Sequence, residues 1–529
     1  MKNILIFILS SGLVIAQSLP FDYAPRHNRL QAVSDINPGS NVIEDILVIN
    51  DTVWLATSKG LSKTGDRGNS WTNYYGEPDF EEESVSLVRY NNGTIWAATW
   101  HFEEINNEDK PVGSGLRYST DNGLTWITIE QPIDLESDTT IVYGSNILKA
   151  RPQTDAIDNF IYDVAFTSGT VWIASKLGGV RKSTDMGETW QRVVLPPDYF
   201  DEINPADILS FELSPIPGAY TSENNLNHQV FSLLGQNDSV VYVGTANGIN
   251  KTTDGGLSWK KITHTNQQLP ISGNHVLKIS YDESSNALWV TTWKAVTASE
   301  NWGVSMSSDG GESWQTFLPG EKTHGLGFKY FYNGSSITDA HVFAATEKGM
   351  FRTSNGGETW IASPEIIDDV TNVKVTTSHF RSVACGYNAD GSVDIWLGSL
   401  GGLVRLTETN GFWDGQWKVF ITSKPVASAR ESYVFPNPFH AGAGNSVTRF
   451  KYSTDGINKE VTIRIFDFGM NLVRTVIQNV TRNFNNNDTP RDYWDGRDEH
   501  RNIVPNGVYF YRIDIGSDDP LYGKILVVR

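Results

Sequence analysis

The sequence has almost no cysteine. Cys385 is the single cysteine among 529 residues, so no disulfide bond can form within the chain. It lies in the strand-like run 382–385, where a small buried thiol is the expected role. Side-chain packing and backbone hydrogen bonds must therefore supply the stability of the fold.

Positive charge is also scarce. The chain has 42 Lys and Arg against 61 Asp and Glu, which gives a formal net charge of −19. Residues 430–529 hold 13 basic and 12 acidic residues, so the whole of the net negative charge lies before them. An acidic surface repels phosphate backbones, which argues against nucleic acid as a partner.

The short motifs of metal and nucleophile chemistry are missing. The ten histidines are scattered, without H-x-x-x-H or H-E-x-x-H spacing, and no G-x-S-x-G or phosphate-binding glycine loop occurs. We therefore expect no metal site and no cofactor.

Long apolar runs are absent apart from one at the N-terminus. Lys2 precedes an apolar stretch from Ile4 to Ile15, and Ala16 follows it. This order predicts a secretory signal peptide over 1–16, because the run is shorter than the roughly 20 residues that span a bilayer. We expect a mature chain without a transmembrane segment.

A repeated pattern is present instead, [ST]-x-D-x-G-x-[ST]-W. It occurs at 64–71, 119–126, 183–190, 252–259 and 307–314; at 353–360 Asn355 replaces the Asp, and a worn seventh copy ends at Trp417. Strands with period-2 alternation precede the copies, as in Thr52 to Thr57. Repeated four-stranded units that close into a ring predict an all-β protein with a seven-bladed β-propeller over 17–422.

The pattern resembles the Asp-box, or bacterial neuraminidase repeat. The resemblance covers roughly residues 40 to 421 and implies the propeller fold, but its members include sialidases, glucan hydrolases, sorting receptors and assembly factors. We expect the box residues to be structural, capping backbone N–H groups in a hairpin. They are Asp66, Asp121, Asp185, Asp254, Asp309 and Asn355.

Long insertions point to a ligand-binding face. If the boxes are hairpins between the third and fourth strands of each blade, the insertions after Trp100 and Trp293 and the connections 130–158 and 196–227 lie on the opposite face. Aromatic residues in or beside the insertions can stack on sugar rings or hold a peptide. These candidates are Trp100, His101, Phe102, Trp293 and Trp302.

A second domain follows a linker at 423–432. Turns at Asn506-Gly507 and Asp495-Gly496 between strand-like runs predict a small immunoglobulin-like β-sandwich over 433–529. This stretch resembles the C-terminal sorting domain of type IX secretion cargo and the related domain of flagellar hook-cap proteins. The resemblance rests chiefly on Pro436, Asn437, Pro438, Phe439, Gly507, Tyr509 and Lys524.

The sorting-domain resemblance implies export to the surface of a Gram-negative cell through outer-membrane secretion machinery. The leading functional prediction is a secreted or cell-surface recognition propeller that binds a glycan or protein and is not an enzyme. The alternative is an extracellular polysaccharide hydrolase with paired carboxylates in the propeller funnel, drawn from residues such as Glu103, Glu104, Asp134, Asp155, Asp158 and Asp163. A purely structural surface protein is the third possibility.

Overall fold

The computed structural model describes residues 34–35, 37–106, 108–214, 225–375, 377–422, 426, 428–435, 437–441, 447–484 and 492–528. The predicted signal peptide, part of the predicted linker and Pro436 lie outside these residues. Within them, the only helix is the 3-10 turn Leu226–His228, and no helix is long and apolar enough to cross a membrane.

Most of the chain forms seven antiparallel sheets with at least four strands each, which we number 1 to 7 along the sequence. Period-2 sequences produce them because alternate side chains face the two neighbouring sheets. Their strands are β2 (Ile43–Ile49), β3 (Thr52–Thr57), β4 (Leu61–Thr64) and β5 (Trp71–Asn73) in sheet 1; β6 (Ser84–Asn91), β7 (Thr94–Ile105), β8 (Glu108–Ser119) and β9 (Ile127–Ile129) in sheet 2; β12 (Ile161–Thr167), β13 (Thr170–Ser175), β14 (Gly179–Ser183) and β15 (Gln191–Arg192) in sheet 3; β18 (Val230–Gly235), β19 (Val241–Thr245), β20 (Gly248–Thr252) and β21 (Trp259–Ile262) in sheet 4; β22 (His275–Asp282), β23 (Ala287–Trp293), β24 (Gly303–Ser307) and β25 (Gln315–Phe317) in sheet 5; β26 (Thr323–Asn333), β27 (Ser336–Thr346), β28 (Gly349–Thr353) and β29 (Ile361–Ala362) in sheet 6; and β30 (Phe380–Tyr387), β31 (Val393–Ser399), β32 (Gly402–Gly411) and β33 (Asp414–Phe420) in sheet 7.

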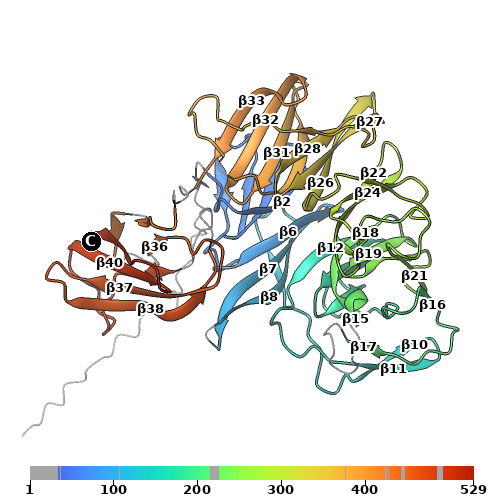
Figure 1. Ribbon diagram of the computed structural model, residues 1–529, viewed down its shortest axis with the longest axis horizontal. Helices are drawn as coiled ribbons and strands as arrows, with labels where there is room; N and C mark the ends of the chain where they lie inside the picture. The colour runs from blue at the N-terminus through green and yellow to red at the C-terminus, as the bar shows by residue number, and fades with distance from the viewer. Residues whose placement is uncertain are drawn as a thin grey trace, which may run out of the picture.

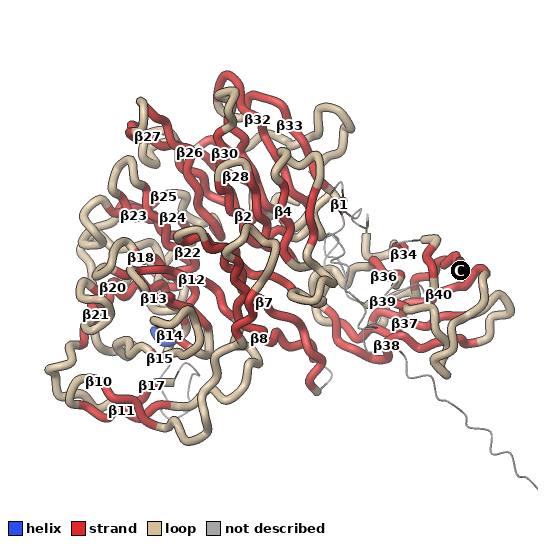
Figure 2. Tube along the Cα trace, turned by 180° about the vertical axis from the view of Figure 1, so that it is seen from behind, coloured by secondary structure: helices blue, strands red, loops and turns tan. Residues whose placement is uncertain are grey.

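The sheets form a closed ring. The first strand of each sheet contacts the first strand of the next, and β30 of sheet 7 contacts β2 of sheet 1 (Figures 1 and 2). Apolar side chains, including Trp54, Trp96, Trp172 and Trp289, fill the spaces between neighbouring sheets. This is the architecture of a β-propeller. The prediction of an all-β fold is confirmed.

The turn between the third and fourth strands is built by the repeated pattern. In sheet 1, Asp66 Oδ1 accepts hydrogen bonds from Thr64 Oγ1 at 2.8 Å and from the Ser70 backbone N–H at 2.9 Å. The Ser70 hydroxyl donates to Asp66 Oδ2 at 2.6 Å. In sheet 6, Asn355 Oδ1 accepts the same two bonds, while its Nδ2 donates to Thr359 Oγ1. The acidic residue thus serves as an acceptor that joins the two sides of the turn.

The glycine of each box also meets the preceding sheet. Gly68 has φ +77°, and a Cβ there would lie 2.5 Å from Cζ of Phe420 in sheet 7. The same close approach recurs at Gly256, against Trp172, and at Gly357, against Phe317. Glycine is required both for its backbone conformation and for this contact between sheets.

Side chains join the first sheet to the last. All four strands of sheet 7 come from residues 380–420, and Arg67 of sheet 1 pairs bidentately with Asp394 of sheet 7, at 2.6 and 2.7 Å. The ends of the ring meet where the Thr422 backbone N–H donates to Asn41 Oδ1 at 2.6 Å and its hydroxyl donates to the Pro38 carbonyl at 2.7 Å.

The two long connections between sheets 2 and 3 and between sheets 3 and 4 contain strands of their own. They contribute β10 (Thr140–Tyr143), β11 (Asn146–Ala150) and β17 (Glu212–Leu213), which form a separate sheet at the rim of the ring (Figure 1). The Tyr143 hydroxyl donates to the Leu257 carbonyl, inside the box of sheet 4. The connections therefore reach the box of sheet 4, while residues 156–158 pair with Pro111, Val112 and Gly113 of the insertion after Trp100. Their placement on the ligand face stays a prediction. β1 (Ser34–Asp35) and β16 (Glu202–Ile203) extend sheets 1 and 4 at their outer edges.

Two further sheets pack face to face in the C-terminal part, around Phe450, Ile463, Trp494 and Tyr511. One contains β34 (Tyr433–Phe435), β36 (Thr448–Lys451) and β39 (Tyr493–Trp494); the other contains β35 (Phe439–His440), β41 (Leu521–Val528), β40 (Gly507–Ile515), β37 (Lys459–Phe466) and β38 (Leu472–Arg482). Arg482 pairs with Asp492 at 2.9 Å and with Asp109 of the propeller at 2.7 Å.

The residues quoted for the sorting resemblance lie around β41. Asn437 Oδ1 accepts from the Leu526 backbone N–H, and its Nδ2 donates to the Lys524 carbonyl. Phe439 and Tyr509 are buried in the domain core, Gly507 begins β40, and the Pro438 and Lys524 side chains are exposed.

Candidate functional site

A cavity of about 530 Å³ lies at the centre of the ring. It is lined by side chains from the first strand of every sheet, together with Trp100 of β7. An axial cavity of this size, walled by aromatic and charged groups, suits a polar ligand with apolar faces, such as a sugar.

Each first strand contains a β-bulge at the same place. The register with the second strand shifts across one residue in all seven sheets. Bulges redirect side chains next to functional sites, and here all seven bulged residues line the cavity. We call this set the bulge belt: Glu44, Ser86, Tyr162, Phe231, Leu277, His324 and Arg381.

An arc of aromatic rings runs along the cavity and beyond it. Successive ring centroids are 4.3 to 6.3 Å apart, starting from sheet 2 and ending in sheet 6. The members of this aromatic arc are Phe102, Trp100, Phe160, Tyr162, Phe231, His275, Trp293 and His324. Rings in such a row offer apolar faces against which sugar rings can pack.

The predicted ligand residues of sheet 2 have different surroundings. Trp100 lines the cavity and stacks on Phe160 at 5.1 Å. His101 Nδ1 lies 3.2 Å from Glu83 and within hydrogen-bonding distance of the Ser114 hydroxyl. Phe102 is 46% exposed and faces the C-terminal domain across a second cavity. Only Trp100 of these three lines the central cavity.

The predicted residues of sheet 5 lie beside the cavity. Trp293 donates from Nε1 to the Thr323 carbonyl at 3.0 Å, and its ring lies 5.1 Å from that of His324. Lys322 Nζ lies over both Trp293 and Trp302, at 5.4 and 5.9 Å from the ring centroids. The structure thus brings Trp100 and Trp293 into one arc and places Trp302 at its edge.

Charged groups form a network at one side of the cavity. Arg89 pairs with Asp163 at 2.5 Å and also with Asp45. Lys278 Nζ lies 3.5 Å from Asp163 Oδ2. The same oxygen accepts a hydrogen bond from the Leu233 backbone N–H at 3.1 Å. Burial opposes ionisation of Asp163, but Arg89 and Lys278 outweigh it and lower the pKa of this carboxyl. Asp163 is therefore a fixed anion.

Glu44 is the single carboxylate of the bulge belt. Among the described residues it makes no hydrogen bond or ion pair, whereas Asp45 and Asp163 are both held by Arg89. The cavity therefore contains one carboxyl without a side-chain partner among the described residues and two carboxylates held in place by Arg89. The other acidic candidates lie elsewhere: Glu103 and Glu104 are exposed on β7, Asp134 pairs with Arg181, Asp155 accepts from the Ile157 backbone N–H, and Asp158 does not line the cavity.

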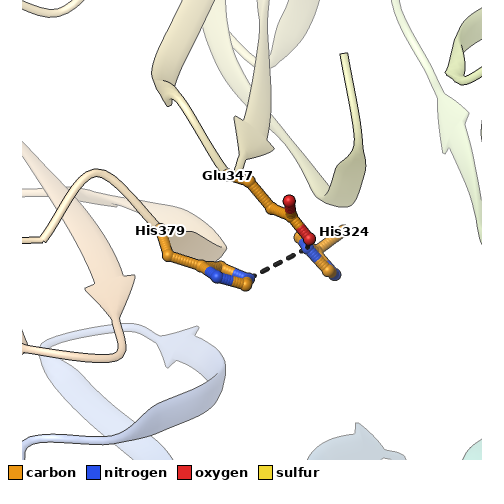
Figure 3. Close-up of side chains that lie close together, drawn as sticks. All are labelled: His324, Glu347 and His379. Atoms are coloured by element: carbon orange, nitrogen blue, oxygen red, sulfur yellow. Dashed lines mark hydrogen bonds and ion pairs between the residues drawn. The ribbon is translucent and has the colours of Figure 1, made fainter. Parts of the chain in front are cut away.

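Two histidines meet a carboxylate at the edge of the cavity (Figure 3). His324 Nε2 lies 3.0 Å from His379 Nε2 and 3.6 Å from Glu347 Oε1. Burial, followed by the charge of Arg381, lowers the pKa of His324 to about 2 and that of His379 to about 4. Both imidazoles are neutral at pH 7.

Several residues of the cavity could not be singled out from the sequence. Glu44, Tyr162 and Phe231 lie in first strands, and Phe160 directly precedes one; the alternation of these strands is that of ordinary core strands. An alignment of the seven first strands would have exposed the bulge belt, because its members occupy equivalent positions in each sheet. His324 and His379 are 55 residues apart, so no local motif links them.

No protein-family model matches the chain. Xyloglucanase Xgh74A of Acetivibrio thermocellus is 23% identical over 294 residues, which are 50% of this chain and 30% of the relative. A xyloglucanase of Paenibacillus sp. is 26% identical over 341 residues, 59% of this chain and 30% of the relative. The matches thus cover under a third of each relative. Among solved structures, the GH74 enzyme of Niastella koreensis aligns with 94% of this chain and 75% of its own, at 15% identity and a TM-score of 0.48.

These relatives overturn the leading functional prediction. A recognition propeller without catalysis was expected because sequence cannot show two carboxylates within catalytic reach of each other. The curated relatives that match are named as xyloglucanases, which favours the hydrolase alternative. The prediction of a purely binding module is therefore wrong.

Proposed function

We propose that the chain is an extracellular glycoside hydrolase that cleaves a xyloglucan-type polysaccharide. The observation that carries this proposal is the match to xyloglucanases over about half of the chain. The central cavity supports it with an aromatic arc and with carboxylates in two different environments.

In this proposal the polysaccharide lies along the aromatic arc, with the bond to be cleaved beside Glu44. Glycoside hydrolysis needs one carboxylic acid to protonate the leaving oxygen and one carboxylate to act as nucleophile, as base or as a stabiliser of positive charge. Glu44 takes the first role because it has no cation partner. Asp163, kept ionised by Arg89 and Lys278, stabilises the developing positive charge.

The test measures reducing ends released from xyloglucan by residues 17–529. We expect release by the wild type and a fall in kcat of at least about 100-fold in Glu44→Gln. Glu103→Gln is the matched control, because Glu103 is exposed on β7 outside the cavity. A wild type that releases no product from xyloglucan or other β-glucans would contradict the proposal. Full activity in Glu44→Gln would reject the assignment of the acid.

The finer architecture belongs to the same proposal. We infer that the seven sheets are the blades of an Asp-box propeller over 17–422, and that 433–529, after the linker 423–432, is an immunoglobulin-like sorting domain. The signal peptide 1–16 and this domain would carry the enzyme to the surface of a Gram-negative cell through outer-membrane secretion machinery. Deletion of 433–529 should leave the propeller in the periplasm, as fractionation would detect. Unchanged export would count against the sorting role.

A further inference from the structure

The His324, Glu347 and His379 side chains come from three separate segments that are fixed to one another. The Glu347 backbone N–H donates to the Lys322 carbonyl at 3.1 Å, and the Ser378 hydroxyl donates to the Glu347 carbonyl at 2.8 Å. His324 is the second residue of β26, Glu347 lies in the turn between β27 and β28, and His379 comes directly before β30. The three side chains are therefore held together by the backbone around them.

The separation of the ligand atoms suits a tetrahedral metal ion. One nitrogen from each histidine and one oxygen of Glu347 all lie within 4.8 Å of one another, with 3.0 Å between the two Nε2 atoms and 3.6 Å from His324 Nε2 to Glu347 Oε1. Ligands about 2.1 Å from a tetrahedral zinc ion are roughly 3.4 Å apart. Lys322 holds the other oxygen, Oε2, at 3.5 Å and leaves Oε1 turned toward the histidines.

We propose that His324, His379 and Glu347 form a binding site for a divalent transition-metal ion, with zinc as the best-suited ion. Two imidazoles and one carboxylate are a ligand set that zinc takes in proteins, and three protein ligands leave a fourth position for water or a substrate oxygen. His324 belongs to the bulge belt, so the site would adjoin the cavity. Metal binding is independent of the hydrolase proposal and can be measured without substrate.

The Arg381 side chain should weaken metal binding by His324, and a substitution can test this. Its Nη1 lies 3.1 Å from His324 Nδ1, and a guanidinium can only donate. His324 Nδ1 therefore accepts, and its proton is on Nε2, directed at His379. To bind a metal through Nε2, His324 must place the proton on Nδ1, where an acceptor is required and Arg381 offers none. A glutamine at 381 would supply a carbonyl oxygen and remove the repelling charge.

The experiment titrates metal-free full-length protein with Zn²⁺ by calorimetry and with Co²⁺ by visible absorption. We expect one ion per chain in the wild type, a Kd raised at least about 10-fold in His379→Ala and in Glu347→Gln, and a Kd lowered at least threefold in Arg381→Gln. His500→Ala removes an exposed histidine of the C-terminal domain and should leave the Kd unchanged.

Absence of saturable binding by the wild type would overturn the site. So would an unchanged Kd in both ligand variants, because the ion would then bind elsewhere. A raised Kd in Arg381→Gln would contradict coordination through His324. Glu347 and His379 are only partly buried, so both variants should fold, and a thermal melt checks this.

Discussion

At the scale of single residues, the acidic position of each box is an acceptor whose charge is dispensable. Asn355 retains the bonds from the Thr353 hydroxyl and the Thr359 backbone N–H. A carboxylate in the same place is held ionised by its donors: the Thr125 side chain, followed by its backbone N–H, lowers the pKa of Asp121 to about 2. With a carboxylate at this position, the stability that the box contributes therefore depends on pH; with an amide it does not.

This difference predicts the acid behaviour of Asp121→Asn. Because the folded pKa of Asp121 lies below its ordinary value of about 3.8, its stabilising effect is complete above pH 3.8 and is lost as the pH falls toward 2. The melting temperature of the wild type should exceed that of the variant slightly at pH 7, and the gap should close between pH 3.8 and 2.

The measurement is a series of thermal melts from pH 7 to pH 2. Glu103→Gln serves as the control, because Glu103 accepts no hydrogen bond from the described residues, and its difference from the wild type should stay flat over this range. A gap for Asp121→Asn that is the same at pH 2 and pH 7 would show that its hydrogen bonds do not depend on the charge.

Residue-level prediction worked where a motif was local and failed where partners were distant. The box pattern predicted where the turns lie, because every donor and acceptor falls within about seven residues. Trp100 and Trp293 could be chosen from their positions beside insertions. Trp100 and Trp293 join in one arc only through four further rings, which lie at sheets 3, 4 and 5: Phe160, Tyr162, Phe231 and His275. The ligand roles of all of these remain predictions.

At the scale of elements, sheets 1 to 6 each meet the preceding sheet through the box glycine. In Gly68→Ala, the new methyl would occupy a residue with φ +77° and clash with Phe420. Strain at positive φ costs about 1 kcal/mol, and overpacking adds about 1–3 kcal/mol. We expect a clear fall in the melting temperature.

The variant Gly76→Ala separates the effect of backbone strain from that of the clash with the neighbouring sheet. Gly76 has φ +82°, but a Cβ there would meet nothing within 4 Å. This variant therefore carries the backbone strain without the clash, and it should melt between Gly68→Ala and the wild type. Equal melting temperatures for the two variants would mean that the contact with sheet 7 contributes nothing to stability.

The insertion after Trp100 illustrates why some elements were missed. The segment 101–110 is rich in Glu, Asn and Asp, which are poor strand formers, and it was expected to be a loop. Residues 101–105 and 108–110 of this segment instead extend β7 and β8 and pair with each other. Its end pairs with Arg482, 373 residues away along the chain, so its structure depends on a contact that no local pattern encodes.

At the scale of the whole molecule, the ion pair between Asp109 and Arg482 connects the propeller to the C-terminal part. Arg482 is 5% exposed and binds Asp492 within its own domain and Asp109 across the interface. Asp109→Ala removes the interdomain partner and leaves the internal one. We expect the two domains to move apart, which small-angle X-ray scattering would record as a larger radius of gyration.

Glu103→Ala is the control for this change, because it alters an exposed acid on the same extension. Its radius of gyration should equal that of the wild type. Should Asp109→Ala also match the wild type, the other interface contacts, such as Lys59 over Phe435 at 5.6 Å, must hold the domains together without the ion pair.

The way the ring closes has a consequence for chain connectivity. Among the described residues, no strand from one end of the propeller is inserted into the sheet at the other end, and Thr422 is hydrogen-bonded to Pro38 and Asn41. A circular permutant that joins these ends and opens the chain between any two sheets would leave every sheet uninterrupted. Each of the seven sheets is in this sense an equivalent starting point, as in a ring that grew by duplication of one unit.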